Sequence, residues 1–227
     1  MAGIRSIAIA GCLWAALMGA ATVGAADTAQ ALALRWTFAV FRGNGSQGAL
    51  FAVTGDTTLH TGDRLKFFSA HDSPCYVYWI HLDSRRRIHL LHPVRSGGTD
   101  LPPVAGEAFF IPVGADWFRL DDQVGEERFY LLASTVRLDR LETLLSDLSA
   151  SRQAAAESHT PAILEEIRSL RRQHGRFKKP AERPPTIMGQ VRSGDQGTWP
   201  DLEQVKHMAT RVRTNIFYSK VFTIDHR

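Results

Sequence analysis

The sequence has 227 residues, with 27 Lys and Arg, 23 Asp and Glu, and two cysteines. This length suffices for one domain with its own hydrophobic core, and two cysteines exclude a small fold held together by several disulfides. Residues 27–150 carry 12 basic and 15 acidic side chains, a net charge of −3, whereas residues 151–227 carry 14 and 8, a net charge of +6. The positive charge therefore lies in the C-terminal third and does not indicate a nucleic-acid-binding core.

The first 26 residues have the pattern of a secretory signal peptide. Arg5 precedes an uninterrupted run of apolar and small residues, Ser6–Val23, and small residues follow at Ala25-Ala26. A basic start, an apolar middle and a small-residue cleavage site together mark a chain for export. We therefore predict cleavage near Ala26 and a periplasmic or secreted protein of bacterial type.

The N-terminal segment has two alternatives to a cleaved signal peptide. The apolar run approaches the roughly 20 residues that span a bilayer, so it could remain as an uncleaved anchor. Ile9-Ala10-Gly11-Cys12 resembles a lipoprotein cleavage site. Cleavage there would leave too short an apolar segment before Cys12 and a strongly apolar mature N-terminus, which argues against a lipoprotein.

Alternating apolar residues predict a mainly β domain over residues 27–137. Leu34–Arg42 places Leu34, Trp36, Phe38 and Val40 on one face, as a half-buried strand does. Further strands are predicted at residues 49–54, 64–69, 75–82, 88–92, 108–113, 118–120 and 128–134. Short strands 8–12 residues apart with Gly-, Asp- and Pro-containing turns between them are typical of a β-sandwich or barrel. The expected fold is a small, Ig-like β-sandwich.

The pattern changes from strand to helix at Leu138. Leucines at helical spacing predict the first helix of an extension over residues 138–175. Thr160-Pro161 predicts the start of a second helix, and Gly175 its end. Residues 176–213 are expected to be a flexible basic linker. Residues 214–227 predict a C-terminal strand that returns to an edge of the sandwich, because such a strand would promote aggregation if it were left unpaired.

A succession of short motifs in the β domain resembles a known family. The motifs are Thr61–Phe67, Cys75–Ile80, Leu82–Ser84, Ile88–Pro93, Trp117–Asp121, Gly125–Glu127 and Leu131–Ser134. Over about residues 55–135, this order resembles the bacterial family catalogued as domain of unknown function 4384. The resemblance implies a small β-sandwich-like module, alone or attached to signalling and protease-like domains, with no known activity. Where the family has a turn glycine this chain has Arg86, which leaves the turn type of the Asp83–Arg87 hairpin open.

Three histidines and one cysteine are candidates for chemical sites. His81, His89 and His92 flank the predicted hairpin, and three imidazoles would suffice for a zinc ion. In a regular strand, however, His89 and His92 point to opposite faces, so no metal site is predicted. Cys75 lies among apolar strand residues and is expected to be a buried packing residue rather than a nucleophile. The sequence contains neither a nucleophile elbow nor a phosphate-binding loop, so neither catalysis nor a cofactor is predicted.

Aromatic residues are the strongest positive feature of the sequence. Tyr76-Val77-Tyr78-Trp79-Ile80 is apolar on both faces, as expected of a central sandwich strand whose rings pack in the core. If one face were open, Tyr76, Tyr78, Trp79 and Trp117 would form a tentative binding platform for a glycan or a peptide.

These observations predict an exported, non-enzymatic binding or scaffolding module of the bacterial cell envelope. Its partner would be an envelope protein or a glycan, and not a nucleic acid. The alternatives are a glycan- or cell-wall-binding module that uses the aromatic platform and, third, an enzyme with an unrecognised site. The basic C-terminal third would make weak contact with anionic surfaces such as lipid or cell-wall polymer, or serve only as a solubilising flank.

Overall fold

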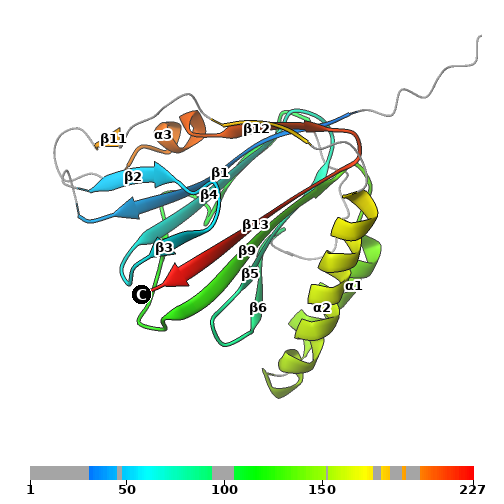
Figure 1. The fold of residues 1–227 in the computed structure, drawn as a ribbon. Coiled ribbons are helices and arrows are strands. Elements are labelled where there is room, and N and C mark those ends of the chain that lie inside the picture. The colour runs from blue at the N-terminus through cyan, green and yellow to red at the C-terminus, as the bar shows by residue number, and fades with distance from the viewer. Residues whose placement is uncertain are drawn as a thin grey trace, which may run out of the picture.

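The computed structural model describes residues 31–44, 48–93, 105–151, 153–175, 180–184, 191–192 and 200–227; the side chains of 153–157 and 191–192 are not described. The predicted signal peptide, residues 1–26, lies outside the described residues. Within them, the strands form an eight-stranded and a five-stranded sheet, which face each other as the two layers of a β-sandwich (Figure 1). The predicted fold class is thereby confirmed.

The first sheet is organised around β1. Its strands are β1 (Leu32–Arg42), β2 (Ala49–Ala52), β4 (Arg64–His71), β7 (Ala108–Ile111), β8 (Phe118–Arg119), β10 (Ala181–Arg183), β11 (Val191–Arg192) and β12 (Thr210–Thr214). One edge of β1 pairs with β4, and the other pairs with β12 along its first half and with β2 along its second half. β10 pairs with β12, and β7 and β8 pair with β4.

The second sheet has the order β3-β13-β9-β5-β6. Its strands are β3 (Thr57–Leu59), β5 (Tyr76–Leu82), β6 (Ile88–His92), β9 (Gly125–Ser134) and β13 (Phe217–His226). The C-terminal strand β13 therefore returns to the sandwich as predicted. It does not lie at an edge, however, because it pairs with β9 on one side and with β3 on the other.

The main hydrophobic core lies between the two sheets. Alternate residues of β1, from Leu32 to Val40, point into it and meet inward-facing residues of β5, β9 and β13. Ring pairs cross the interface: the centroids of Trp36 and Phe222 lie 5.3 Å apart, and those of Phe67 and Trp79 lie 4.7 Å apart. These contacts between aromatic rings join the two layers.

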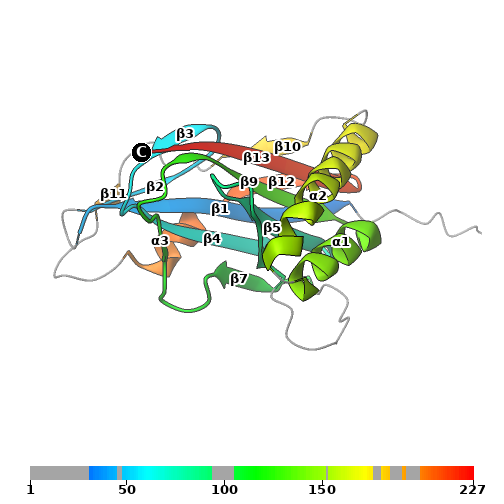
Figure 2. The ribbon, with the colours of Figure 1, turned by 90° about the horizontal axis from the view of Figure 1, so that it is seen from below.

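Two helices cover the outer face of the second sheet (Figures 1 and 2). α1 (Asp139–Ala150) and α2 (Gln153–His174) form a second core with outward-facing residues of β5, β6 and β9. The prediction that the second helix begins at Thr160 is wrong, because α2 begins at Gln153 and Pro161 lies inside it. Residues 154–156 are alanines, which favour a helix strongly enough to extend it before the proline.

The structure differs from the sequence prediction over residues 176–213, which were expected to be a linker. The described part of this range contains β10, β11, the short helix α3 (Leu202–His207) and most of β12. Three apolar residues explain the ordering of its C-terminal half. Val205 and Met208 pack on the outer face of the first sheet, and Val212 packs in the main core.

Arg86 lies in the turn of the β5–β6 hairpin, at the position where the family that the sequence resembles has a glycine. Arg86 has a φ of 66°, in the left-handed region that glycine adopts without steric cost. The Asp83 carboxylate stabilises the turn, because it accepts hydrogen bonds from the backbone N–H and the Nε–H of Arg87 at 2.7 and 2.8 Å. In this chain, an arginine therefore occupies a left-handed turn position that favours glycine.

Candidate functional site

The four aromatic residues predicted as a platform do not share a surface. Trp79 points into the main core and donates a hydrogen bond from Nε1 to Ser69 Oγ at 2.9 Å. Tyr78 is buried under the helices and donates to Glu142 at 2.6 Å, and the half-buried Tyr76 packs in the same cluster. Trp117 packs beside α3 on the other sheet. The rings thus lie in three separate clusters, because side chains alternate along β5 and Trp117 belongs to the opposite layer.

The hairpin histidines do not point to opposite faces as expected. The β5–β6 register shifts between Trp79 and Ile80, so Trp79 pairs with His92 and His81 pairs with His89. This bulge turns His92 to the inter-sheet side, where its ring stacks on Phe109 at 3.9 Å. Burial, with a smaller contribution from His71, lowers the pKa of His92 to about 4 and keeps it neutral near pH 7. In the described part of the chain, no three His, Cys, Asp or Glu side chains are grouped as a metal site requires.

A buried carboxylate links two histidines where the second sheet ends. Glu127 on β9 accepts hydrogen bonds from His81 Nε2 at 2.7 Å and from His226 Nδ1 at 3.0 Å. The other nitrogen of His226 lies 3.3 Å from Thr61 Oγ1. Both carboxylate oxygens are thus engaged, and the His226 side chain is fully buried. This network ties the last residues of β13 to β9 and β5, and of its two histidines only His81 reaches the surface in part.

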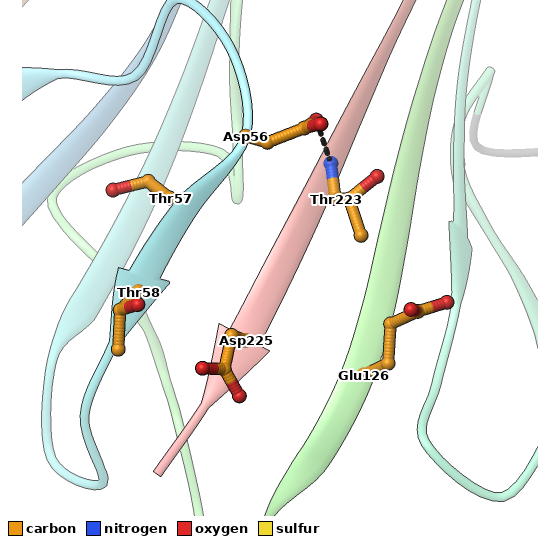
Figure 3. A pocket seen from close by; sticks show the side chains of 6 residues that line it. All are labelled: Asp56, Thr57, Thr58, Glu126, Thr223 and Asp225. Atoms are coloured by element: carbon orange, nitrogen blue, oxygen red, sulfur yellow. Dashed lines mark hydrogen bonds between the residues drawn. The ribbon is translucent and has the colours of Figure 1, made fainter.

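An acidic hollow of about 390 Å³ lies on the opposite, solvent-facing side of β3, β13 and β9 (Figure 3). It is lined by Asp56, Thr57, Thr58, Glu126, Thr223 and Asp225. Asp56 accepts a hydrogen bond from the backbone N–H of Thr223 at 2.9 Å. Glu126 and Asp225 form ion pairs with Arg128 and Arg227, each at 2.6 Å. These carboxylates already have partners within the fold, so the hollow does not by itself indicate a ligand.

Cys75 directly precedes β5, and its side chain is fully buried. Burial, together with the charge of Asp72, raises the pKa of its thiol to about 12. Because the thiolate is the reactive form, we expect Ellman's reagent to label Cys75 slowly in the native protein and quickly in urea. The measurement uses the processed protein, from which Cys12 is removed with the signal peptide, so that one thiol is counted. Rapid labelling of the native protein would contradict the buried position.

A buried cation holds the segment between β7 and β8. Lys66 on β4 has no exposed surface, and its ammonium group donates hydrogen bonds to Pro112 O and Gly114 O, each at 2.7 Å, and to Asp116 O at 2.6 Å. Burial lowers the pKa of Lys66, and the charge of Asp116 opposes this shift. The ammonium supplies donors to three backbone carbonyls and therefore has a structural role.

Four arginines gather on the outer face of the first sheet, beside α3. Val212 points into the main core, so its neighbours Arg211 and Arg213 point outward and are exposed. Arg211 pairs in register with Arg35 of β1 on one side and with Arg183 of β10 on the other. Directly opposed residues of neighbouring strands lie about 5 Å apart, so the Cα atoms of these three arginines fall within about 10 Å. We call Arg35, Arg183, Arg211 and Arg213 the arginine face.

Within the described residues, ion pairs neutralise only part of the arginine face. Arg35 forms an ion pair with Asp72 at 3.0 Å. Among the described residues, no ion pair is formed by Arg183, Arg211 or Arg213. Like charges directly opposite each other destabilise a sheet, and Arg211 has an arginine on both sides. An anion placed over the row would remove this repulsion and could accept paired N–H bonds from the guanidinium groups.

Sequence reasoning located the positive charge but missed this face. The net charge of +6 over residues 151–227 showed that a basic region exists. The alternation of Thr210-Arg211-Val212-Arg213-Thr214 was the signal for an outward-facing pair of arginines on a strand. The contributions of Arg35 and Arg183 depend on strand register and have no counterpart in the local sequence.

Comparisons with known proteins identify part of the chain. Within the described residues, no helix is both long enough and apolar enough to cross a membrane. No curated protein and no solved structure matches the sequence. One family model matches, and it runs from the second residue of β3 to the end of β9 and the three residues that follow it. Residues 58–137 match the model of the family described as Domain of unknown function (DUF4384), the family that the sequence motifs predicted.

Proposed function

We propose that the protein is an exported, non-enzymatic binding or scaffolding module of the bacterial cell envelope that holds an anionic partner on the arginine face. The observation that carries the proposal is the register of β10, β12 and β1, which places Arg183, Arg211 and Arg35 side by side. Such a row of like charges does not stabilise the sheet. Binding of an anionic partner is a better explanation for it.

One further observation supports export, and a second explains why the binding part of the proposal uses the arginine face. The N-terminal 26 residues have the basic, apolar and small-residue pattern of a signal peptide. The aromatic residues that would have formed a glycan platform lie in separate clusters, so the proposal rests on the arginine face and not on the rings.

Export is tested by fractionation of a bacterial host that expresses the full chain with a C-terminal tag. We expect the protein in the periplasmic or envelope fraction, with an N-terminus near Asp27, because signal peptidase cleaves after small residues such as Ala25-Ala26. N-terminal sequencing of the recovered chain decides the outcome. A chain that keeps Met1, or one that starts at a lipid-modified Cys12, would contradict the proposal.

The binding part of the proposal is tested on the same fractions. At low salt the wild-type protein should sediment with the envelope and be released at high salt, because exposed charges are screened. Arg211→Gln should weaken this association, whereas the matched control Arg171→Gln on α2 should not. Arg171 is exposed, and α2 covers the other sheet. If the two variants associated equally with the envelope, the association would depend on overall charge and not on the arginine face.

A further inference from the structure

We infer that the arginine face, together with the exposed apolar residues at the adjoining end of the sandwich, is a docking surface for a membrane that contains anionic phospholipids. This inference rests on the proposed function and names the partner of the same surface. Its three supports are the charge of the face, the apolar side chains beside it, and the position at which the chain enters the domain.

The arginine face suits phosphodiester groups. Guanidinium is planar and offers several N–H donors that match two oxygens of one phosphate, whereas lysine acts as a point charge. The residues that flank Arg213 have small side chains, because Arg213 pairs with Ala33 on one side and with Ala181 on the other. Charged headgroups could therefore approach the guanidinium groups without displacing bulky neighbours.

Two exposed apolar residues lie at the end of the sandwich next to this face. Val136 and Ile216 expose 59% and 39% of their surface, and both are in turns. The backbone N–H of Thr135 donates to Ile216 O at 2.9 Å, which holds the two turns together. Ile216 follows Arg213 by three residues in the β12–β13 turn (Figure 1). Cationic groups beside exposed aliphatic side chains are the pattern by which proteins bind the membrane interface.

The chain enters the domain at the same end. β1 begins at Leu32, which pairs with Thr214 and donates from its N–H to Asn215 O at 3.3 Å. The apolar segment Ser6–Val23, which would engage the membrane during export, is separated from Leu32 by eight residues. Eight residues reach at most about 28 Å, so until signal peptidase cuts near Ala26 this end of the domain stays within that distance of the apolar segment. The C-terminal residues lie at the opposite end of the sheets (Figures 1 and 2).

A membrane explains the two features together better than a soluble polyanion does. A polyanion such as polyphosphate would bind the guanidinium groups but has no apolar part that could contact Val136 and Ile216. Anionic phospholipids offer phosphates to the arginines and an acyl boundary to the aliphatic side chains.

The test measures binding of the processed protein, recovered from the export experiment, to two kinds of vesicle and to long-chain polyphosphate. The vesicles are phosphatidylglycerol mixed with phosphatidylcholine, and phosphatidylcholine alone. Of the two kinds of vesicle, we expect the protein to bind only the mixed ones. Arg211→Gln should weaken this binding about fivefold, as for the loss of one basic residue near an anionic surface. Arg171→Gln should change nothing. Val136→Ser should weaken binding to vesicles and leave binding to polyphosphate unchanged.

The outcomes separate the two proposals. Binding to polyphosphate without binding to mixed vesicles, or vesicle binding that Val136→Ser does not weaken, would overturn the membrane inference and leave an anionic partner of the arginine face standing. Absence of binding to both probes, or equal losses for Arg211→Gln and Arg171→Gln, would overturn the arginine face as a site and the proposed function with it. Thermal unfolding confirms that each variant is folded, and Arg211→Gln should not lower the melting temperature because it relieves repulsion.

Discussion

Replacing Phe222 with alanine is expected to destabilise the protein by about 3–5 kcal/mol, the usual cost of removing a buried phenylalanine ring. Phe222 is fully buried on β13, and its ring centroid lies 5.3 Å from those of Trp36 and Phe38, in the opposite sheet. The ring therefore joins the two layers, and its loss leaves a cavity between them. Urea unfolding followed by tryptophan fluorescence measures the effect, because Trp36 lies beside the new cavity.

The matched control is Thr223→Ala, one residue along β13. Thr223 points to the solvent-facing side of the sheet, where its backbone N–H, and not its side chain, donates to Asp56. We expect this change to cost less than about 1 kcal/mol. If Phe222→Ala were no more destabilising than Thr223→Ala, β13 would not be an interior strand of the sandwich.

The local sequence was enough to predict the strands of the β domain. Leu34, Trp36, Phe38 and Val40 alternate with outward residues, and this alternation appeared as β1. The same signal predicted a strand at the C-terminus, because Phe222 and Ile224 are two residues apart and both face the core. The alternation of apolar residues predicts a strand but does not predict which strands pair with it. β13 was expected at an edge, whereas it lies between β3 and β9.

The remaining differences arise where distant segments decide the local structure. Residues 202–214 look like linker by composition, and their few apolar residues become significant only because β1 and β4 offer surfaces for them. His92 faces the core because of a bulge that no spacing rule revealed. The basic charge of the C-terminal third was visible in the sequence, but the opposition of Arg211 to Arg35 and Arg183 depends on two strand pairings.

The family match covers only part of the structural unit in this chain. Residues 58–137 include most of β3 and all of β4 to β9, but neither β1 nor β13. β1 pairs with β4 over eight register positions from Leu34 to Phe41, and β13 pairs with β9 along its whole length. Each sheet is therefore completed by a strand from outside the matched range, and in this protein the family segment folds together with its flanking strands.

Replacing Lys66 with methionine is expected to destabilise the protein by about 3–5 kcal/mol. Methionine preserves much of the apolar stem but supplies no donor, so the carbonyls of Pro112, Gly114 and Asp116 lose the group that binds them. Hydrogen bonds to charged groups contribute about 1.5–3 kcal/mol each, and the three bonds share one ammonium, so their sum is not the expected loss. Chemical denaturation of the wild type and the variant measures the difference.

Arg64→Met is the matched control, because it removes one positive charge from the same strand and the same face. Arg64 Nη1 donates to Gly43 O in an exposed hydrogen bond, so its replacement should cost less than about 1 kcal/mol. The loss at Lys66 should also be local, with hydrogen exchange accelerating first at the backbone amides of residues 113–118, because the ammonium fixes this segment on β4. Equal stability losses for the two variants, or unchanged exchange in residues 113–118, would show that the buried ammonium does not hold the segment. The three carbonyl contacts would then be a consequence of burying Lys66 and not the reason that the segment is ordered.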